Sequence, residues 1–160
     1  MSGMKVFMKI EGIPGSATEK NRADWSSLRG FSHQLEYPFD MREGKGRGEP
    51  MHGACTILKE IDKTSPKLYE ALCKKLSVEK VEIEFERDKP GEGGTEIYFR
   101  IVLAKCRVVF ARPHIPTVSE RDETTPPHMD QIGFAYQEIN WEWDSDGKLP
   151  TTFIFADTSQ

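Results

Sequence analysis

The sequence contains no long hydrophobic run, no block of basic residues and no regular cysteine pattern. No 18 consecutive residues are apolar, and the N-terminus lacks a long apolar segment, so neither a membrane span nor a cleavable signal peptide is predicted. A net charge of −4 without a Lys/Arg block argues against nucleic acid as the main partner. If the protein leaves the cell, it must use a machinery that reads no such signal.

The cysteines and histidines are too scattered to predict a disulfide or a metal site. Cys55, Cys73 and Cys106 are odd in number and far apart, which is typical of reduced cysteines in a protein made in the cytoplasm. His52 and Cys55 form the only close His/Cys pair, and a strand would point them to opposite faces. We therefore expect no metal and no cofactor.

Catalytic signatures are also scarce. His114 lies in a proline-rich stretch and could serve a hydrolase with Cys106, Ser119 or Asp122 as partner, yet no nucleophile elbow accompanies it. The glycine-rich residues 44–48 lack the following helix and the Lys-Ser/Thr pair of a phosphate-binding loop. The sequence thus favours a protein that is not an enzyme.

The three tryptophans leave a second class of function open. Trp25, Trp141 and Trp143 would suit a β-barrel that binds a small ligand or a carbohydrate by stacking. Packing inside the barrel or at an interface is the alternative interpretation of the same residues, and the one that we favour.

Residues 59–76 have the pattern of a single amphipathic helix. Ser65 is placed to cap it, Pro66 falls at its first position, and two lysines follow in its last turn. So short a helix is stable only when it docks on a sheet. Three leucines at steps of four form its apolar stripe: Leu68, Leu72 and Leu76.

The rest of the chain has the alternation of antiparallel strands. Glutamates alternate with apolar residues between 80 and 87 and predict a solvated strand face, while residues 40–50 and 112–130 predict long loops. A kink is expected at Gly30 and a bulge near Gln137. Together these features predict one domain over residues 1–160, a mainly β fold with an antiparallel β-barrel of two packed sheets and one helix on its side. The strands are expected at residues 4–10, 25–39, 51–61, 80–87, 95–111, 131–144 and 151–155.

The strand at residues 95–111 is apolar on both faces along much of its length. A barrel hides only one face of a strand, so the second face should lie under the helix or against another copy of the chain. Copies in a closed ring would cover such a surface. The candidate subunit-interface residues on this strand are Tyr98, Arg100, Val102, Ala104, Cys106, Val108 and Phe110.

Four stretches of the sequence carry a resemblance to a known family: MKVFMKIEGIPG at the start, KEIDKTSPKLYEALCKKL in the middle, the hairpin VEIEFERDKPGEGGTEIYFRIVLAKCRV, and FAYQEINWEWDSDG near the end. They resemble the Hcp family, the haemolysin-coregulated proteins of bacterial type VI secretion. The most specific match, together with the leucine that follows it on the helix, comprises Asp62, Lys63, Thr64, Ser65, Pro66, Leu68 and Leu72.

The resemblance implies a mechanical function without catalytic residues. It implies a homohexameric ring, stacking of rings into the inner tube of the secretion system, and release of the tube from the cell without a cleavable signal peptide. The partners that it implies are further copies of the chain, the spike protein VgrG, the contractile sheath, and secreted effectors carried in the lumen.

Overall fold

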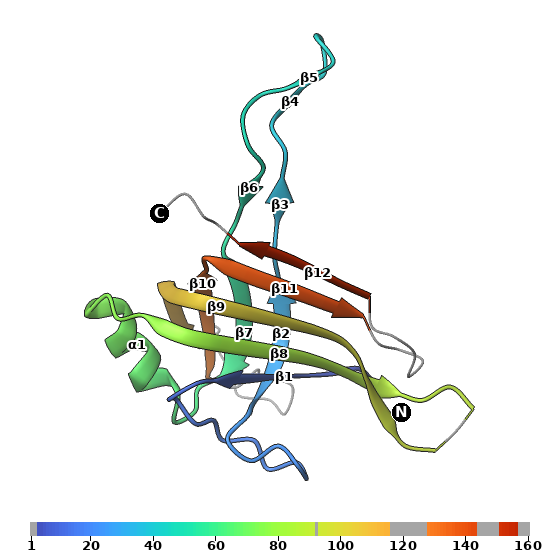
Figure 1. Ribbon diagram of the computed structural model, residues 1–160. Helices are drawn as coiled ribbons and strands as arrows, with labels where there is room; N and C mark the ends of the chain where they lie inside the picture. Colours follow the sequence, from blue (N-terminus) through green and yellow to red (C-terminus); the bar gives the residue numbers. More distant parts are fainter. Residues whose placement is uncertain (1–2, 92, 116–127, 144–150, 157–160) are drawn as a thin grey trace.

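A computed structural model describes residues 3–91, 93–115, 128–143 and 151–156, and Figure 1 shows the arrangement of their strands around one side helix. This part of the chain contains twelve strands and one helix. They are β1 (Lys5–Ile10), β2 (Ser26–Ser32), β3 (Leu35–Glu36), β4 (Phe39–Asp40), β5 (Lys45–Gly46), β6 (Met51–His52), β7 (Cys55–Glu60), α1 (Ser65–Cys73), β8 (Val78–Asp88), β9 (Thr95–His114), β10 (Met129–Ala135), β11 (Glu138–Trp143) and β12 (Thr151–Ala156).

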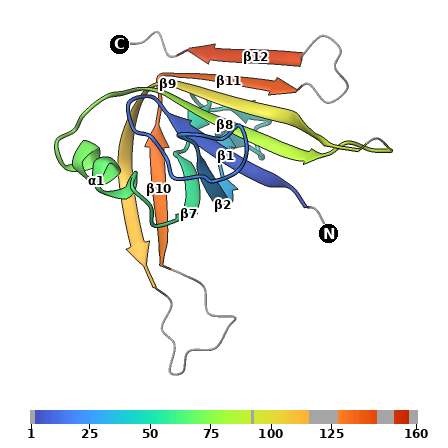
Figure 2. The same ribbon diagram turned by 90° about the horizontal axis from the view of Figure 1, so that it is seen from below.

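Eight antiparallel strands form the body, in the order β10-β7-β2-β1-β8-β9-β11-β12. An additional pairing between β9 and β10 closes six of them into a barrel. The remaining pair, β11 and β12, continues the sheet beyond β9 as a flap, which lies along the upper edge of the molecule in Figure 2. The predicted mainly β barrel with a side helix is confirmed.

The long strand β9 changes partner in the middle because its backbone turns at Lys105. Residues before this point pair with β11 and residues after it pair with β10. Lys105 has φ +54°, a left-handed conformation that bends the strand. The buried side switches accordingly, from Ile101 and Leu103 before the bend to Cys106 and Val108 after it. One strand therefore serves two parts of the sheet.

Helix α1 docks on β9, as predicted, but it is shorter than predicted. Thr64 rather than Ser65 is the N-cap residue, and the two lysines expected in the last turn lie at and beyond the C-cap. Leu68 is fully buried and Leu72 is half-buried, whereas Leu76 lies beyond the helix and is exposed. Leu76 leaves the apolar face because Lys75 adopts a positive φ of 56° and turns the chain.

The predicted loop at residues 40–50 is instead part of a paired arm. Strands β3 and β6 pair with each other, and β4 pairs with β5, so that the chain leaves the barrel and returns beside itself. Figure 1 shows this arm standing clear of the barrel. Two-residue strands need only backbone hydrogen bonds, which explains why a polar, glycine-rich composition concealed them.

Two predicted irregularities are confirmed. The register of β2 against β7 shifts between Leu28 and Gly30. The strand predicted at 131–144 is interrupted at residues 136–137, between β10 and β11. The 112–130 prediction is only partly tested, since β9 runs on to His114, β10 begins at Met129, and residues 116–127 lie outside the described residues. The Asp146-Gly147 pair is typical of a tight hairpin turn, and it too lies outside the described residues.

Candidate functional site

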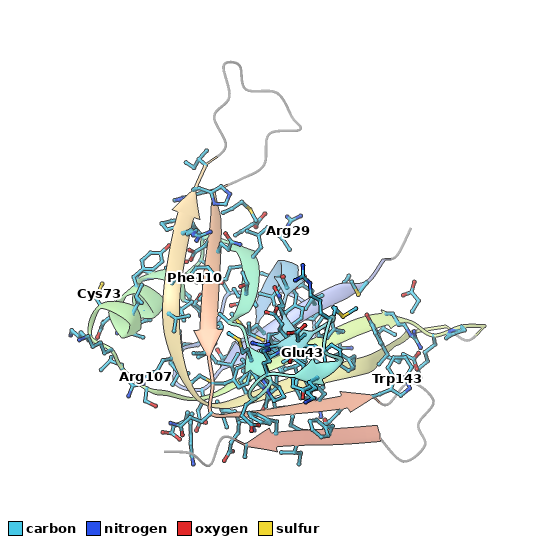
Figure 3. The ribbon with its side chains drawn as sticks, turned by 90° about the horizontal axis from the view of Figure 1, so that it is seen from above. Arg29, Glu43, Cys73, Arg107, Phe110 and Trp143 are labelled. Atoms are coloured by element: carbon cyan, nitrogen blue, oxygen red, sulfur yellow. The ribbon has the colours of Figure 1, made fainter. Side chains whose placement is uncertain are left out.

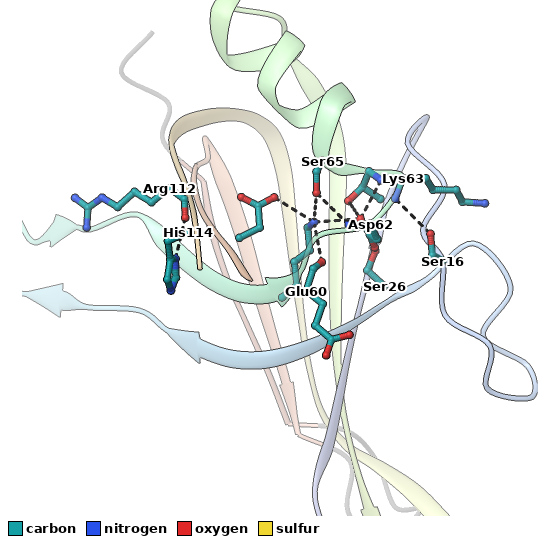
Figure 4. A network of polar contacts seen from close by, with 11 residues as sticks. Ser16, Ser26, Glu60, Asp62, Lys63, Ser65, Arg112 and His114 are labelled. Carbon is teal, nitrogen blue, oxygen red and sulfur yellow. Dashed lines mark hydrogen bonds and ion pairs between the residues drawn. The ribbon is translucent and has the colours of Figure 1, made fainter. Parts of the chain in front are cut away.

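The family-like block at residues 62–68 builds a buried network of charges at the start of the helix (Figure 4). The Nζ atom of Lys59 lies 3.1 Å from Oδ1 of Asp62, 3.3 Å from Oδ2 of Asp130 and 2.8 Å from Oγ of Ser65. The side chains of Lys59 and Asp130 have no exposed surface. The network joins the end of β7, the N-terminus of α1 and the start of β10.

Asp62 is the hub of the connection that precedes the helix. The backbone N–H of Thr64 donates to its Oδ1 at 2.9 Å, the Thr64 hydroxyl donates to the same atom, and Ser26 Oγ donates to Oδ2 at 3.1 Å. Burial opposes ionisation of this carboxyl, but the Thr64 hydrogen bonds and the Lys59 charge outweigh it and lower the Asp62 pKa below its ordinary value. Asp62 is thus held as an anion.

The remaining residues of the block have packing roles or face solvent. Pro66 stands in the first turn, where a missing N–H costs nothing, and Lys63 is exposed. Burial, with the Asp130 carboxylate nearby, raises the pKa of Tyr69 to about 12. These contacts connect the start of α1 to β7 and β10.

Fewer of the apolar side chains of β9 point outwards than we predicted from the sequence. Tyr98, Arg100, Val102 and Ala104 point to this face and are all partly exposed. Arg100 is paired with Glu84 at 2.6 Å and with a glutamate of β11 at 3.4 Å. The middle of the predicted interface is therefore a charged strip flanked by small apolar residues.

The prediction that Cys106 and Val108 lie at the subunit interface is wrong. Both lie in the core of the barrel, because the bend at Lys105 reverses the alternation of β9. Burial raises the pKa of Cys106 to about 12, so this thiol also cannot act as the hydrolase nucleophile considered above. Phe110 remains half-exposed, with its ring lying over its register partner Gly133 (Figure 3).

The charged strip extends further than the sequence indicated, because Glu84 also contacts Arg22. Arg22, in the loop after β1, pairs with Glu84 at 2.6 Å and Glu86 at 2.9 Å. Its guanidinium lies 4.4 Å from the Phe7 ring and 4.7 Å from the Trp25 ring. Glu84 is buried, so the prediction that these glutamates form a solvated surface is wrong for this residue.

Register relations place exposed apolar residues of the flap beside the predicted interface strand. Asn140 pairs with Val102 on one side and with Ile154 on the other, so these three side chains form one row on the outer face. Ile154 is 65% exposed. Its neighbour Phe153 points to the other face of the flap, is 63% exposed and stacks on Trp141. No other strand pairs with the free edge of β12 among the described residues.

The arm is the other region where apolar side chains are exposed. Its composition suggested a polar loop, so the sequence reading missed this surface. Met41, at the arm's tip, is 86% exposed. The exposed apolar residues of the arm are Leu35, Tyr37, Phe39, Met41 and Met51.

The other sequence candidates do not form a common site. Trp25 stacks on Arg22, Trp141 on Phe153, and Trp143 lies against Tyr98, so the three tryptophans form no shared platform. His114 is exposed, and Ser119 lies outside the described residues. No group of three metal-ligating side chains occurs in the part of the chain that the structure describes. Among those residues, no helix is long and apolar enough to cross a bilayer.

Comparison with known proteins identifies the family. The family model described as "Type VI secretion system effector, Hcp" matches residues 7–143. The "Major exported protein" of Pseudomonas aeruginosa is 27% identical over 137 residues, which cover 86% of this chain and 79% of that protein.

Solved structures of Hcp proteins share the fold. A mutant of the Hcp1 protein from E. coli EAEC 042 pathovar superposes with a TM-score of 0.76 at 24% identity, covering 98% of this chain and 99% of that one. A further structure, described as an Hcp protein, gives a TM-score of 0.83 at 19% identity and covers 99% of this chain and 100% of that one. Because the family model matches residues 7–143 and the fold is that of solved Hcp structures, the chain belongs to the Hcp family, the tube subunits of the type VI secretion system.

Proposed function

We propose that copies of this chain form a hexameric ring through the outer face of β9, β11 and β12, and that the rings stack into the inner tube. The observation that carries the proposal is the continuous row of Val102, Asn140 and Ile154, which ends at a strand edge with no partner among the described strands. A ring places one face of a subunit against a different face of its neighbour and leaves no such edge open.

The charged strip within this surface is compatible with burial between copies, because its charges are paired within the chain. Arg100 lies between two glutamates, and a charge that is already paired in the monomer costs less to desolvate at an interface than a free one. Tyr98 and Phe110 lie at the two ends of the same strand and would pack around this strip. The interface proposed from the sequence thus keeps Tyr98, Arg100, Val102, Ala104 and Phe110, and gains Ile154.

Further partners follow from membership of the family. We propose that the tube is built inside the contractile sheath, meets the spike protein VgrG at its tip, and holds secreted effectors in its lumen. We also propose that residues 1–160 act as one unit, that the protein has no catalytic activity, and that it leaves the cell without a cleavable signal peptide. The buried thiol of Cys106 supports the absence of cysteine chemistry at that position.

The ligand-binding alternative is not favoured. Phe134, Ile57, Ile132 and Leu103 have no exposed surface, so they fill the barrel interior where a ligand would have to bind. The cleft of about 280 Å³ beside the helix is lined by both charged and apolar residues and contains none of the three tryptophans. A cleft of about 420 Å³ contains Trp25 but neither of the other two, and most of its lining is charged or polar.

Light-scattering mass and negative-stain imaging test the proposal. The unaltered protein should give a mass near six subunits and ring-shaped particles. Ile154→Asp should shift the mass towards the monomer, because it places a charge in the apolar row. Leu76→Asp is the matched control, since Leu76 is exposed near the helix and outside the proposed surface. A monomer at high concentration of the unaltered protein would contradict the proposal.

A further inference from the structure

The root of the arm contains a hydrogen-bonded trio that the proposed tube function does not use. His33 lies between β2 and β3, His52 belongs to β6, and Tyr136 lies between β10 and β11. The Tyr136 hydroxyl lies 2.7 Å from Nδ1 of His52 and 2.9 Å from Nε2 of His33. One oxygen atom therefore links both strands of the arm to the barrel.

Aromatic rings of the flap hold the two imidazoles in place. His52 stacks on Phe155 with ring centroids 4.1 Å apart, and His33 stacks on Trp141 at 6.4 Å. All three members of the trio are half-buried. Stacking and burial restrict how far either ring can turn away from the shared oxygen, so the hydrogen bonds have to adapt through their protons.

The number of hydrogen-bond donors in the trio determines how many added protons it can hold while both hydrogen bonds remain. A phenol donates one hydrogen bond and accepts others, and a neutral imidazole donates through one nitrogen and accepts through the other. With both rings neutral, Tyr136 donates to one ring and accepts from the other. With one ring protonated, that ring donates to the oxygen and Tyr136 donates to the neutral ring. With both protonated, two N–H groups face one oxygen and the phenol proton has no acceptor within the trio.

We propose that His33, Tyr136 and His52 form a proton-operated lock, which holds the arm to the barrel while the trio carries at most one added proton and releases it when both imidazoles are protonated. The two sides of the arm are joined to each other at this point, because Leu35 pairs with His52 and the Gly53 N–H donates to the Gln34 carbonyl at 2.9 Å. Loss of the shared hydrogen bonds therefore acts on the whole arm.

The electrostatic surroundings favour this sequence of events. Burial lowers the pKa of His33, a hydrogen bond to the Gly53 backbone opposes this, and a charge on His52 lowers the pKa further. The Cys55 thiol interacts with Tyr136, and burial raises the Cys55 pKa to about 12, so that it stays neutral. Because the folded-state pKa of His33 is lowered, its contribution to stability is complete above about pH 6.5 and is lost as the pH falls through the lowered value.

The lock has a consequence for assembly that rests on the proposed function. The arm presents the exposed side chains of Leu35, Tyr37 and Phe39. If copies of the chain contact one another through the arm, acidification should weaken that contact. The lock itself is a property of the single chain, so it can be tested whether or not rings form.

Amide hydrogen exchange on the full chain, corrected for the intrinsic pH dependence, tests the lock. At pH 5.0, protection of residues 33–53 should fall at least tenfold relative to pH 7.5, while protection of β8 should not change. Tyr136→Phe removes the shared oxygen and should loosen the arm at both pH values. His52→Phe keeps a ring against Phe155 but removes one proton site, so the pH response should disappear. His114→Gln is the control and should behave like the unaltered protein.

Two results would overturn the lock. One is equal protection of the arm at both pH values in the unaltered protein, and the other is a full pH response in His52→Phe. If a variant does not fold, nuclear magnetic resonance titration of the unaltered protein decides instead. It should give two apparent imidazole pKa values about one unit apart or more, whereas independent titration of both rings would refute the proposal. A protein that is monomeric at every pH would contradict the ring while leaving the lock to be judged by exchange.

Discussion

Replacing Lys59 with methionine should destabilise the barrel far more than the loss of an exposed charge. Methionine is similar in length, so little packing is lost, but the Asp130 carboxylate remains buried without a cation. Removing one partner of a buried ion pair costs about 3–5 kcal/mol. The matched control is Arg29→Met, which breaks the exposed Arg29–Glu60 pair and should cost about 0–1 kcal/mol.

Urea unfolding at equal oligomeric state measures this difference. With a slope of about 2 kcal/mol per molar urea, the Lys59→Met loss lowers the midpoint by about 2 M. An unpaired buried carboxylate takes up a proton as the pH falls. The loss of unfolding free energy caused by Lys59→Met should therefore be smaller at low pH. The double variant Lys59→Met/Asp130→Leu should regain stability, since apolar residues can replace a buried pair. A loss below about 1 kcal/mol, or a double variant no more stable than Lys59→Met, would refute the reasoning.

Three further predictions concern the bend, the helix and the thiols. Lys105→Gly should leave stability unchanged or raise it by up to about 1 kcal/mol in thermal unfolding, because glycine adopts a positive φ freely, whereas Lys105→Val should lower it. Leu68→Ala should cost about 2–5 kcal/mol in urea unfolding because Leu68 is fully buried, and Leu76→Ala should cost less than about 1 kcal/mol. Mass spectrometry after thiol labelling of the native protein should find the reagent on Cys73 alone, since the other two cysteines are buried; labelling of all three at equal rates would contradict the fold.

The strands that have one solvent-exposed face could be predicted from the sequence. In β8, glutamates mark one side and apolar residues the other, and the change of phase near Gln137 is visible because polar residues flank it. The turn at Lys105 could not be predicted in the same way. Val102, Ala104 and Val108 are apolar on either side of it, so the alternation that would reveal the change of phase is absent.

Contacts between segments that lie far apart in the sequence could not be predicted either. Glu84 reads as one of three equivalent glutamates, and only the fold places Arg22 over it from 62 residues away. The ion pair of Lys59 and Asp130 spans 71 residues in the same way. The family-like stretch, which begins at Lys59, was recognised as a motif, but its physical role also depends on Asp130, which lies outside the residues that carried the resemblance.

Folding and assembly of this subunit are separable, because the barrel completes its own core. The additional β9–β10 pairing closes the sheet, and the outer face of β8 and β9 is neutralised by ion pairs within the chain. The largest exposed apolar side chains of the described residues are concentrated on the arm and on β12, which project from the barrel. Ile154→Asp should therefore reduce the mass of the assembly without lowering the melting temperature of the subunit. If that variant lost both together, the subunit would depend on its neighbours to fold, and β12 would belong to a shared core rather than to a docking surface.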